Sequence, residues 1–456
     1  MPSAQKSAEN SLIPLPAAGQ PLQGSLVMPG DKSVSHRALM LAGITPGCSP
    51  IHGLAPNADV LATQACMAAL GAHIETEAGN IRLRVTGARP LQPPSALLDA
   101  QNAGTCIRLL SGILAAQPFT TTIGGDDSLS RRPMGRIIEP LSRMGAGITA
   151  REGGLAPLTI EPAHQGLHGI DYTLPVASAQ VKSAILLAGL FAPEPTTVRE
   201  PVASRDHTER LFEALGLDIT VATTPEGRAI TLAGNQADRL QPMKYDIPGD
   251  FSSAAFFLVA AACLPGSEVT LSHVGLNVFR TGLLQALQSV GAEITVTNER
   301  LACGEPVGDL VVRGSRLRGD ITLNEPDLPA LIDEIPILAV AAYYLQGTLT
   351  VRGAAELRKK ESDRIEAIRT EFEKLGIPVT VFEDGLSITG RPETPIDPPG
   401  TALAAWHDHR IAMALHVMNV IEAGRHGAGL WPMQGREWMS VSYPQFDQAL
   451  ASLYTQ

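Results

Sequence analysis

The sequence is poor in aromatic residues and has no excess of positive charge. Aromatic residues make up 4% of its 456 residues, and the formal net charge is −11 at pH 7. Proteins that bind nucleic acids or anionic membrane surfaces use basic patches and stacking rings, so neither kind of partner is expected. An anionic small molecule would need cations placed locally, against the charge of the whole chain.

Cysteines are also few. Five occur, widely spaced and without a Cys-x-x-Cys pair, at positions 48, 66, 106, 263 and 303. This spacing predicts neither a disulfide framework nor a zinc site. His407 and His409 flank Asp408, but two histidines without a third ligand make a poor metal site. We therefore expect no metal and no cofactor.

Long hydrophobic runs are missing as well. The longest, 254–264 and 335–345, fall short of the roughly 20 apolar residues that cross a bilayer. Residues 1–24 lack the apolar centre of a signal peptide and contain several Pro and Gly, so we expect a disordered tail there. These features predict a cytoplasmic protein, and the length of the chain suits two domains.

One pattern repeats along the chain. Six polar segments each open onto a long stretch rich in Ala and Leu, at intervals of roughly 70 to 85 residues. Ser, Thr and Asp in these segments are typical of helix starts. Free backbone N–H groups and a partial positive charge make helix starts suitable for anions. The segments begin at Lys32, Gly104, Ser178, Asp250, Asp333 and Asp408.

A glycine recurs in phase with these helix starts. It follows an amphipathic stretch and precedes alternating apolar and polar residues, which predicts a helix, a glycine cap and a strand. The glycines are Gly71, Gly145, Gly216, Gly291 and Gly376. Because each unit then holds two helices and several strands, the sequence predicts an α/β protein of six units, arranged as two domains of three.

Pro-Gly-Asp occurs at the two places where one domain would pass into the other. The tripeptides at 29–31 and 248–250 each predict a stiff turn followed by a helix N-cap. We therefore expect a first domain at 30–249 and a second made of 25–29 and 250–456. The ligand site is expected in the cleft between them.

Charged residues gather near these helix starts. Lys32 and Arg37 belong to the first, and Arg132 stands beside a rigid proline, where its guanidinium can hold a carboxylate or phosphate through two bonds. In the other half lie the charged run 358–364 and the segment 408–410. If equivalent ends of the units converge, cations meet carboxylates, which suits a small polyanion with an acid and a base at hand.

Seven motifs together resemble the 5-enolpyruvylshikimate-3-phosphate synthase family, in order and over residues 25–450. The resemblance implies a two-domain inside-out α/β barrel of six βαβαββ repeats. It implies transfer of the carboxyvinyl group of phosphoenolpyruvate to the 5-hydroxyl of shikimate 3-phosphate through a tetrahedral ketal, with release of phosphate, in aromatic amino acid biosynthesis. The motifs stand at 29–37, 102–105, 131–134, 178–182, 205–209, 360–364 and 408–410.

The resemblance also implies roles for single residues. Asp333 matches the base for the attacking hydroxyl, and Glu361 the group that gives and retrieves the C3 proton, with Lys32 as a second acid. Shikimate 3-phosphate is expected on Lys32, Ser33, Arg37, Ser178, Ala179, Gln180, Arg205, Asp333 and Lys360. Phosphoenolpyruvate is expected on Lys32, Asn102, Gly104, Thr105, Arg132, Gln180, Glu361, Arg364 and Arg410. No partner beyond these substrates is expected, and we expect a monomer.

Some positions depart from the family pattern. Many members carry a Lys just before a C-terminal Ser/Thr-Phe-Pro, where this chain has Val441. A divergent bacterial subgroup, class II, also lacks this Lys and often resists glyphosate, so we hypothesise moderate tolerance. The Asn-x-Thr-Arg string of that subgroup appears here as Asn277-Val278-Phe279-Arg280, and Gly104 stands where some resistant enzymes carry Ala.

Three alternatives stay open. UDP-N-acetylglucosamine enolpyruvyl transferase shares the fold and the donor, but its family uses a Cys that the loop 124–130 lacks. A non-catalytic relative that binds a phosphorylated ligand would be indicated by loss of Asp333, Glu361 or Lys32, and all three are present. An RNA-end-processing relative is disfavoured by the acidic charge and the scarcity of aromatic residues.

Overall fold

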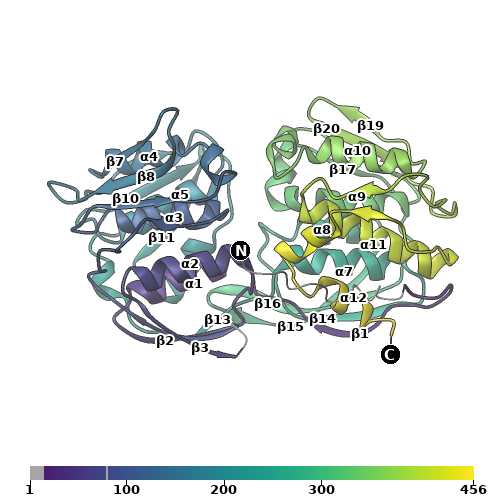
Figure 1. Cartoon of the computed structure of the whole chain (residues 1–456), viewed down its shortest axis with the longest axis horizontal. Coiled ribbons are helices and arrows are strands. Elements are labelled where there is room, and N and C mark those ends of the chain that lie inside the picture. Colours follow the sequence, from purple (N-terminus) through teal and green to yellow (C-terminus); the bar gives the residue numbers. More distant parts are fainter. Residues whose placement is uncertain (1–14, 79–80, 456) are drawn as a thin grey trace, which may run out of the picture.

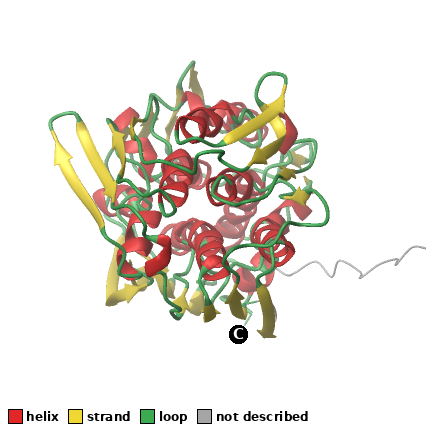
Figure 2. Ribbon diagram, turned by 90° about the vertical axis from the view of Figure 1, so that its left-hand side faces the viewer, coloured by secondary structure: helices red, strands yellow, loops and turns green. Residues whose placement is uncertain are grey.

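The computed structural model describes residues 15–78 and 81–455, which form two lobes (Figure 1). One hydrophobic core is built from residues between 34 and 247, with Cys303 added, and the other from residues 22–28 and 251–454. An end-on view shows the helices gathered inside and the strands outside (Figure 2). Among the described residues the strands form separate sheets rather than one closed barrel.

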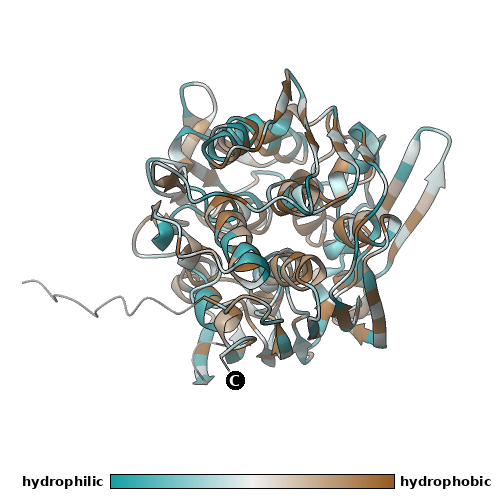
Figure 3. Cartoon of the chain, turned by 90° about the vertical axis from the view of Figure 1, so that its right-hand side faces the viewer, coloured by the Kyte–Doolittle hydropathy of each residue, from teal (hydrophilic) through white to brown (hydrophobic). Residues whose placement is uncertain are grey.

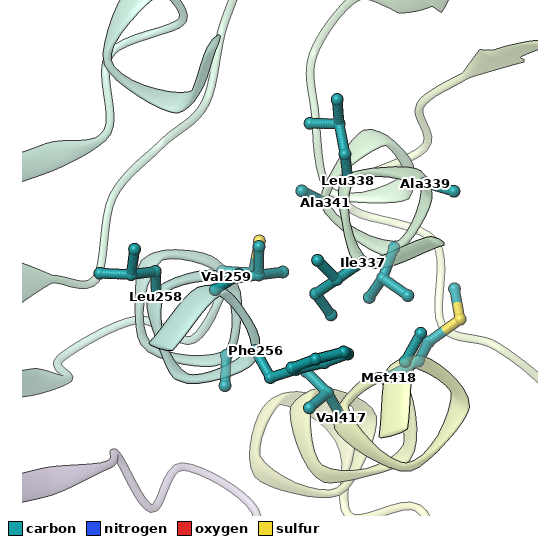
Figure 4. Close-up of a cluster of buried hydrophobic side chains, with 14 of the residues drawn as sticks. Phe256, Leu258, Val259, Ile337, Leu338, Ala339, Ala341, Val417 and Met418 are labelled. Atoms are coloured by element: carbon teal, nitrogen blue, oxygen red, sulfur yellow. The ribbon is translucent and has the colours of Figure 1, made fainter. Parts of the chain in front are cut away.

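The six predicted helix starts are confirmed. Each begins a helix that is mostly buried, and in the second lobe three of these helices pack through side chains such as Phe256, Ile337 and Val417 (Figure 4). The ninth helix follows a 3₁₀ turn, Ile332–Glu334. The six helices are α1 (Lys32–Ile44), α3 (Gly104–Leu114), α5 (Ala179–Gly189), α7 (Phe251–Cys263), α9 (Ile335–Tyr343) and α11 (His409–His426).

The predicted glycine caps are confirmed too. All five glycines adopt positive φ, between 69° and 102°, which an L side chain rarely tolerates. Each follows a half-buried helix and precedes a strand. These helices are α2 (Ala58–Ala69), α4 (Gly135–Arg143), α6 (His207–Ala214), α8 (Gly282–Ser289) and α10 (Arg364–Lys374). A last helix, α12, spans Phe446–Ala451.

Five units carry a four-stranded sheet of one design. A first strand runs parallel to a second, and a hairpin completes the sheet antiparallel to it. The strands alternate hydrophobic and hydrophilic residues, because one face covers the helices (Figure 3). In the first lobe they are β2 (Gly47–His52), β3 (His73–Ala78), β4 (Arg82–Gly87), β5 (Leu98–Asp99), β6 (Thr121–Gly124), β7 (Gly147–Arg151), β8 (Leu155–Glu161), β9 (Asp171–Thr173), β10 (Thr196–Glu200), β11 (Ile219–Thr224), β12 (Gly227–Leu232) and β13 (Tyr245–Asp246).

The sixth unit is shorter than the predicted βαβαββ repeat. After α11 the described chain forms one short strand, a 3₁₀ turn (Arg436–Val441) and α12, without the antiparallel hairpin of the other units. The glycine that follows a helix and precedes a strand occurs five times in the sequence rather than six, which already indicates that one unit is shorter. The strands of the second lobe are β1 (Gln23–Val27), β14 (Glu268–Gly275), β15 (Glu293–Ala302), β16 (Glu305–Arg313), β17 (Ile321–Leu323), β18 (Thr348–Val351), β19 (Thr380–Phe382), β20 (Gly385–Thr389), β21 (Leu403–Ala404) and β22 (Met433–Gln434).

A strand precedes each of the two Pro-Gly-Asp turns, and each strand belongs to the sheet of the lobe that the chain is about to leave. β1 precedes the first turn and pairs with β14 of the second lobe, whereas β13 precedes the second turn and pairs with β2 of the first. The turns bind each other, since Asp31 N donates to Pro248 O at 2.7 Å and Asp250 N to Pro29 O at 2.8 Å. The chain therefore crosses between the lobes twice at one place.

The structure differs from the predicted disordered tail over the part of it that is described. Residues 1–14 lie outside the described residues. Residues 15–24 differ from the expectation of disorder, because Leu22 is fully buried in the second core and Gln23 N donates to Leu453 O at 2.7 Å. The polar composition hid this single apolar anchor. In the part of the chain that the structure describes, no helix has the length and apolar character needed to cross a membrane.

Candidate active site

Asp333 is the centre of a cationic cluster that joins both lobes. Its carboxylate lies 2.7 Å from Arg205 of the first lobe, and 3.3 Å from Lys360 and 3.5 Å from Arg364 of the second. Burial alone would raise the pKa of Asp333, but Lys360, Arg410, Arg205 and Arg364 together lower it well below its usual range. The carboxylate is therefore ionised at neutral pH and ringed by groups that bind anions.

The start of α10 and the start of α11 are joined beside this cluster. Asp408 caps α11 by accepting from Arg410 N at 2.9 Å, and its other oxygen accepts from Arg364 Nε at 2.8 Å. Arg364 is 1% exposed and also contacts Glu361 at 2.7 Å, while the Glu361 side chain stays 42% exposed. Burial would raise the pKa of Glu361, but Arg364 and His409 lower it. Glu361 thus presents an accessible carboxylate held by a fixed guanidinium.

Arg410 closes the second-lobe part of the cluster. Its Nη1 donates to the Asp333 carbonyl oxygen at 2.9 Å and lies 3.4 Å from the buried Glu334. Glu334 in turn accepts a short hydrogen bond from Ser252 Oγ at the start of α7. Three helix starts of the second lobe, those of α7, α9 and α11, are thereby connected through side chains.

In the first lobe, Gln180 links the starts of α3 and α5. Its Nε2 donates to Thr105 Oγ1 at 3.1 Å, and its Oε1 accepts from Arg108 Nη1 at 2.6 Å. Ser178 caps α5 through Val181 N. Arg108 was not among the predicted residues, although it lies one turn after Gly104 on the same helix, and that i, i+4 spacing could have revealed it.

Arg132 lies against the uncapped start of α3. It donates from Nη1 to Asn102 O at 3.3 Å and from Nη2 to Asn102 Oδ1 and Ser128 Oγ. A Cβ placed on Gly104 would stand 2.9 Å from Arg108 Nη1 and 3.3 Å from Arg132 Nη1. Burial, then the charges of Arg132 and Arg136, lower the pKa of Arg108 to about 10. Crowded cations beside free helix N–H groups suit an anion, and a side chain at position 104 would have to displace the ends of these two arginines.

Lys32 and Arg37, on the same helix, have different surroundings. The Lys32 side chain is 44% exposed, and its Nζ lies 3.0 Å from Asp59 Oδ2 at the start of α2. Arg37 is 3% exposed and donates to Thr208 Oγ1, Ser183 Oγ and Ser33 O at 2.7–2.8 Å. Its predicted contact with shikimate 3-phosphate stays a prediction, while its protein contacts tie α1 to α5 and α6.

Arg280 forms a buried ion cluster at the crossing between the lobes. Its Nη2 lies 3.0 Å from Asp250 and 3.8 Å from Asp31, and donates to Ser252 Oγ at 2.6 Å. Burial would raise the pKa of Asp31, but Arg280 and His207 lower it to about 2. One guanidinium thus neutralises the N-cap carboxylates of α1 and α7. No role for Arg280 was predicted from the sequence.

Ten of the predicted residues fall into two groups, whereas Lys32, Ser33 and Arg37 lie on α1 and Ser178 and Ala179 lie at the start of α5. Asp333, Lys360, Glu361, Arg364 and Arg410 lie in one connected network. Asn102, Gly104, Thr105, Arg132 and Gln180 lie around the start of α3, together with Arg108, which was not predicted. The Arg205–Asp333 ion pair connects the lobes. Such a two-lobed α/β fold, with helix starts and cations gathered between the lobes, defines a class of enzymes that join small anionic substrates.

Comparison with known proteins identifies the family. Residues 16–450 match the family described as EPSP synthase (3-phosphoshikimate 1-carboxyvinyltransferase). A 3-phosphoshikimate 1-carboxyvinyltransferase of a Synechococcus species is 47% identical over 98% of this chain and 97% of its own. One of a Synechocystis species is 48% identical over 94% of both. The solved EPSP synthase of Acinetobacter baumannii has a TM-score of 0.86 and 41% identity, and the match covers 96% of this chain and 97% of that one.

The chain belongs to the EPSP synthase family. The predictions of the family, the fold class and an enzyme of the 3-phosphoshikimate 1-carboxyvinyltransferase type are confirmed. The UDP-sugar transferase alternative is not favoured, because the relatives share one activity name over nearly the whole chain. The predicted site residues and domain limits stay predictions.

Proposed function

We propose that this chain transfers the carboxyvinyl group of phosphoenolpyruvate to the 5-hydroxyl of shikimate 3-phosphate, at a site between domains 30–249 and 25–29 with 250–456. The observation that carries the proposal is the Arg205–Asp333 ion pair, which holds a guanidinium of one lobe against a carboxylate of the other. An acceptor whose phosphate binds Arg205 would have its hydroxyl groups close to Asp333. The acceptor and the base are thereby brought together.

The acceptor is proposed to lie on residues of three helix starts. Arg205 takes the 3-phosphate through charge-assisted hydrogen bonds, and Asp333 and Lys360 contact the hydroxyl groups. The exposed Lys32 faces both substrates. The full proposed set is Lys32, Ser33, Arg37, Ser178, Ala179, Gln180, Arg205, Asp333 and Lys360.

The donor is proposed to lie beside the start of α3 and against the second-lobe cations. Arg132 and Arg410 approach the phosphate and carboxylate of phosphoenolpyruvate from opposite lobes, so the donor itself would draw the lobes together. The full proposed set is Lys32, Asn102, Gly104, Thr105, Arg132, Gln180, Glu361, Arg364 and Arg410. Val441, at the position of the family's C-terminal Lys, is 45% exposed and supplies no charge.

The chemistry is proposed as addition followed by elimination. The 5-hydroxyl oxygen attacks C2 while Asp333 accepts its proton and C3 is protonated by Glu361, or by Lys32 as a second acid. Because Arg364 and His409 lower the pKa of Glu361, this carboxylate must first take up a proton to act as the acid. The resulting ketal loses phosphate from C2 and a proton from C3 to form the enol ether. Because Arg205 helps to lower the pKa of Asp333, a substrate phosphate that draws Arg205 away raises that pKa toward the range of a working base.

Phosphate release from phosphoenolpyruvate tests this function. We expect release with shikimate 3-phosphate as acceptor and none with UDP-N-acetylglucosamine, and loss of release in Asp333→Asn. Release with the UDP-sugar alone would contradict the proposal. A chain that binds shikimate 3-phosphate without any turnover would instead be the non-catalytic relative.

We also propose that the enzyme works as a cytoplasmic monomer, without a nucleic-acid or membrane partner. The net charge of −11 supports the absence of a nucleic-acid or membrane partner, because it repels nucleic acids and anionic lipids. Light scattering after size exclusion tests the monomer, with the mass of two chains as the contrary result.

A further inference from the structure

Lys182 is a fully buried cation close to the proposed acceptor site. Its side chain is 0% exposed, and its Nζ lies 3.0 Å from Glu200 Oε2 and 2.6 Å from Glu209 Oε1. Both carboxylates are also buried, at 0% and 4% exposure of their side chains. A side chain without any solvent exposure is not placed to touch a substrate in the site, so Lys182 needs another explanation than substrate contact.

The partners of Lys182 enclose the loop that carries Arg205. Glu200 ends β10 just before this loop, and Glu209 lies on α6 just after it. Within the loop, Ser204 offers its carbonyl oxygen 3.5 Å from Lys182 Nζ, and its hydroxyl donates a short hydrogen bond to Glu200 Oε1. Ser204 is therefore bound by both Lys182 and Glu200, and Arg205 is the next residue in the chain.

Lys182 itself belongs to the helix that begins at the acceptor site. It lies in the first turn of α5, immediately behind Ser178 and Gln180. Lys182, Glu200 and Glu209 form a buried ionic triad. A second link joins α5 to α6 next to this triad, since Ser183 Oγ and Thr208 Oγ1 are 2.7 Å apart. The start of α5 and the Arg205 loop are thus held together as one unit.

Stability alone does not account for this triad. A buried ion pair costs desolvation, and well-packed apolar side chains of similar volume are often at least as stabilising. The pKa of Glu209 is raised by burial despite the nearby Lys182, which indicates that this desolvation is substantial. The triad does, however, fix the position of the loop between β10 and α6, which carries Arg205, the proposed contact of the substrate phosphate.

We infer that Lys182 is a positioning residue, which holds Arg205 at the place where the 3-phosphate of shikimate 3-phosphate binds. This inference rests on the proposed role of Arg205. Lys182 ties the loop to α5, so that Arg205, Ser178 and Gln180 meet the same substrate without rearrangement. A displacement of the guanidinium by about 1 Å would weaken its bonds to the phosphate and its orientation of the acceptor.

The test compares shikimate 3-phosphate with shikimate, which lacks the phosphate. Calorimetry gives the ratio of their dissociation constants for the full chain and for Arg205→Ala, Lys182→Met and Glu209→Gln. We expect the preference for the phosphorylated ligand to fall at least about ten-fold in Arg205→Ala, since charge-assisted bonds are lost. We expect a fall in the same direction in Lys182→Met and, more weakly, in Glu209→Gln, which keeps Lys182 paired with Glu200.

A matched control separates positioning from stability. Ile160→Ala on β8 truncates a fully buried core residue of the same lobe without touching the triad. It should lower the melting temperature and leave the preference unchanged. If Arg205→Ala reduces the preference but Lys182→Met and Glu209→Gln do not, the positioning role is wrong. If Ile160→Ala reduces it as much as Lys182→Met, the effect is loss of stability, and the inference is also wrong.

Failure of the proposed function gives a different result. An Arg205→Ala variant with an unchanged preference would show that Arg205 does not hold the phosphate, whatever the other variants do. If Lys182→Met does not fold, Glu209→Gln decides the outcome alone, because it removes one anchor and leaves the buried lysine paired.

Discussion

Removal of Arg280 should destabilise the crossing between the lobes more than removal of any exposed arginine. Arg280 is 6% exposed and neutralises Asp31 and Asp250, which cap α1 and α7. In Arg280→Met the two carboxylates stay buried without their common partner. Breaking a buried pair in this way costs about 3–5 kcal/mol of unfolding free energy. The exposed Arg352–Asp384 pair offers a control, because Arg352→Met should cost at most about 1 kcal/mol.

The pH dependence of this loss has a definite sign. In the intact protein the folded pKa of Asp31 is lowered to about 2, so Asp31 contributes stability above its unfolded pKa of 3.8, which disappears as the pH falls from 3.8 to about 2. Without Arg280, burial dominates and raises the folded pKa of Asp31. The variant is then destabilised at neutral pH and recovers as the pH falls and Asp31 binds a proton.

The assay is urea unfolding at pH 7 and pH 5, followed by the fluorescence of the chain. The free energy of unfolding is taken from the first transition in the fluorescence. The difference between Arg280→Met and the intact protein should be smaller at pH 5. Asp31→Asn added to Arg280→Met should restore part of the loss, since Asn still caps a helix without a charge. A loss below 1 kcal/mol at pH 7, or a double variant less stable than Arg280→Met, would refute the reasoning.

The remaining predictions concern the reaction. Asp333→Asn should lower kcat by about 10²–10⁴, the usual contribution of a general base; steady-state kinetics with a change under ten-fold would speak against this role. Because the pKa of Asp333 in the free enzyme lies well below its usual range, kcat/KM for shikimate 3-phosphate, which reports the free enzyme, should show no acid limb from this group near neutral pH, and a limb that Asp333→Asn abolishes would contradict the assignment. Gly104→Ala should raise the KM for phosphoenolpyruvate, because its Cβ would displace Arg108 and Arg132; an unchanged KM would show that neither guanidinium holds the donor. Glyphosate competing with phosphoenolpyruvate should inhibit only above micromolar concentration, and sub-micromolar inhibition would rule tolerance out.

Much of the fold follows from local signals that the sequence displays. Helix starts at Asp31, Ser178, Asp250 and Asp408 are capped by their own side chains, so the local chemistry and the structure agree. The glycine caps agree for the same reason, because a left-handed residue is required where each helix turns into a strand. The order of the motifs was enough to indicate the family.

Contacts between distant segments were harder to predict. Leu22 looked like part of a polar tail, since nothing nearby in sequence shows that the second core covers it. Nothing near Glu209 in the sequence shows that it pairs with Lys182 of another helix. Arg280 pairs with two caps about 30 and 250 residues away in sequence, a distance that no periodicity reveals.

A crystal structure of the chain with shikimate 3-phosphate and glyphosate would test the central claim most directly. The account predicts one occupied site, with the 3-phosphate on Arg205, the 5-hydroxyl beside Asp333, and the phosphonate between Arg132 and Arg410. Ligands bound within a single lobe, or a 3-phosphate held away from Arg205 with the Arg205–Asp333 pair intact, would contradict it.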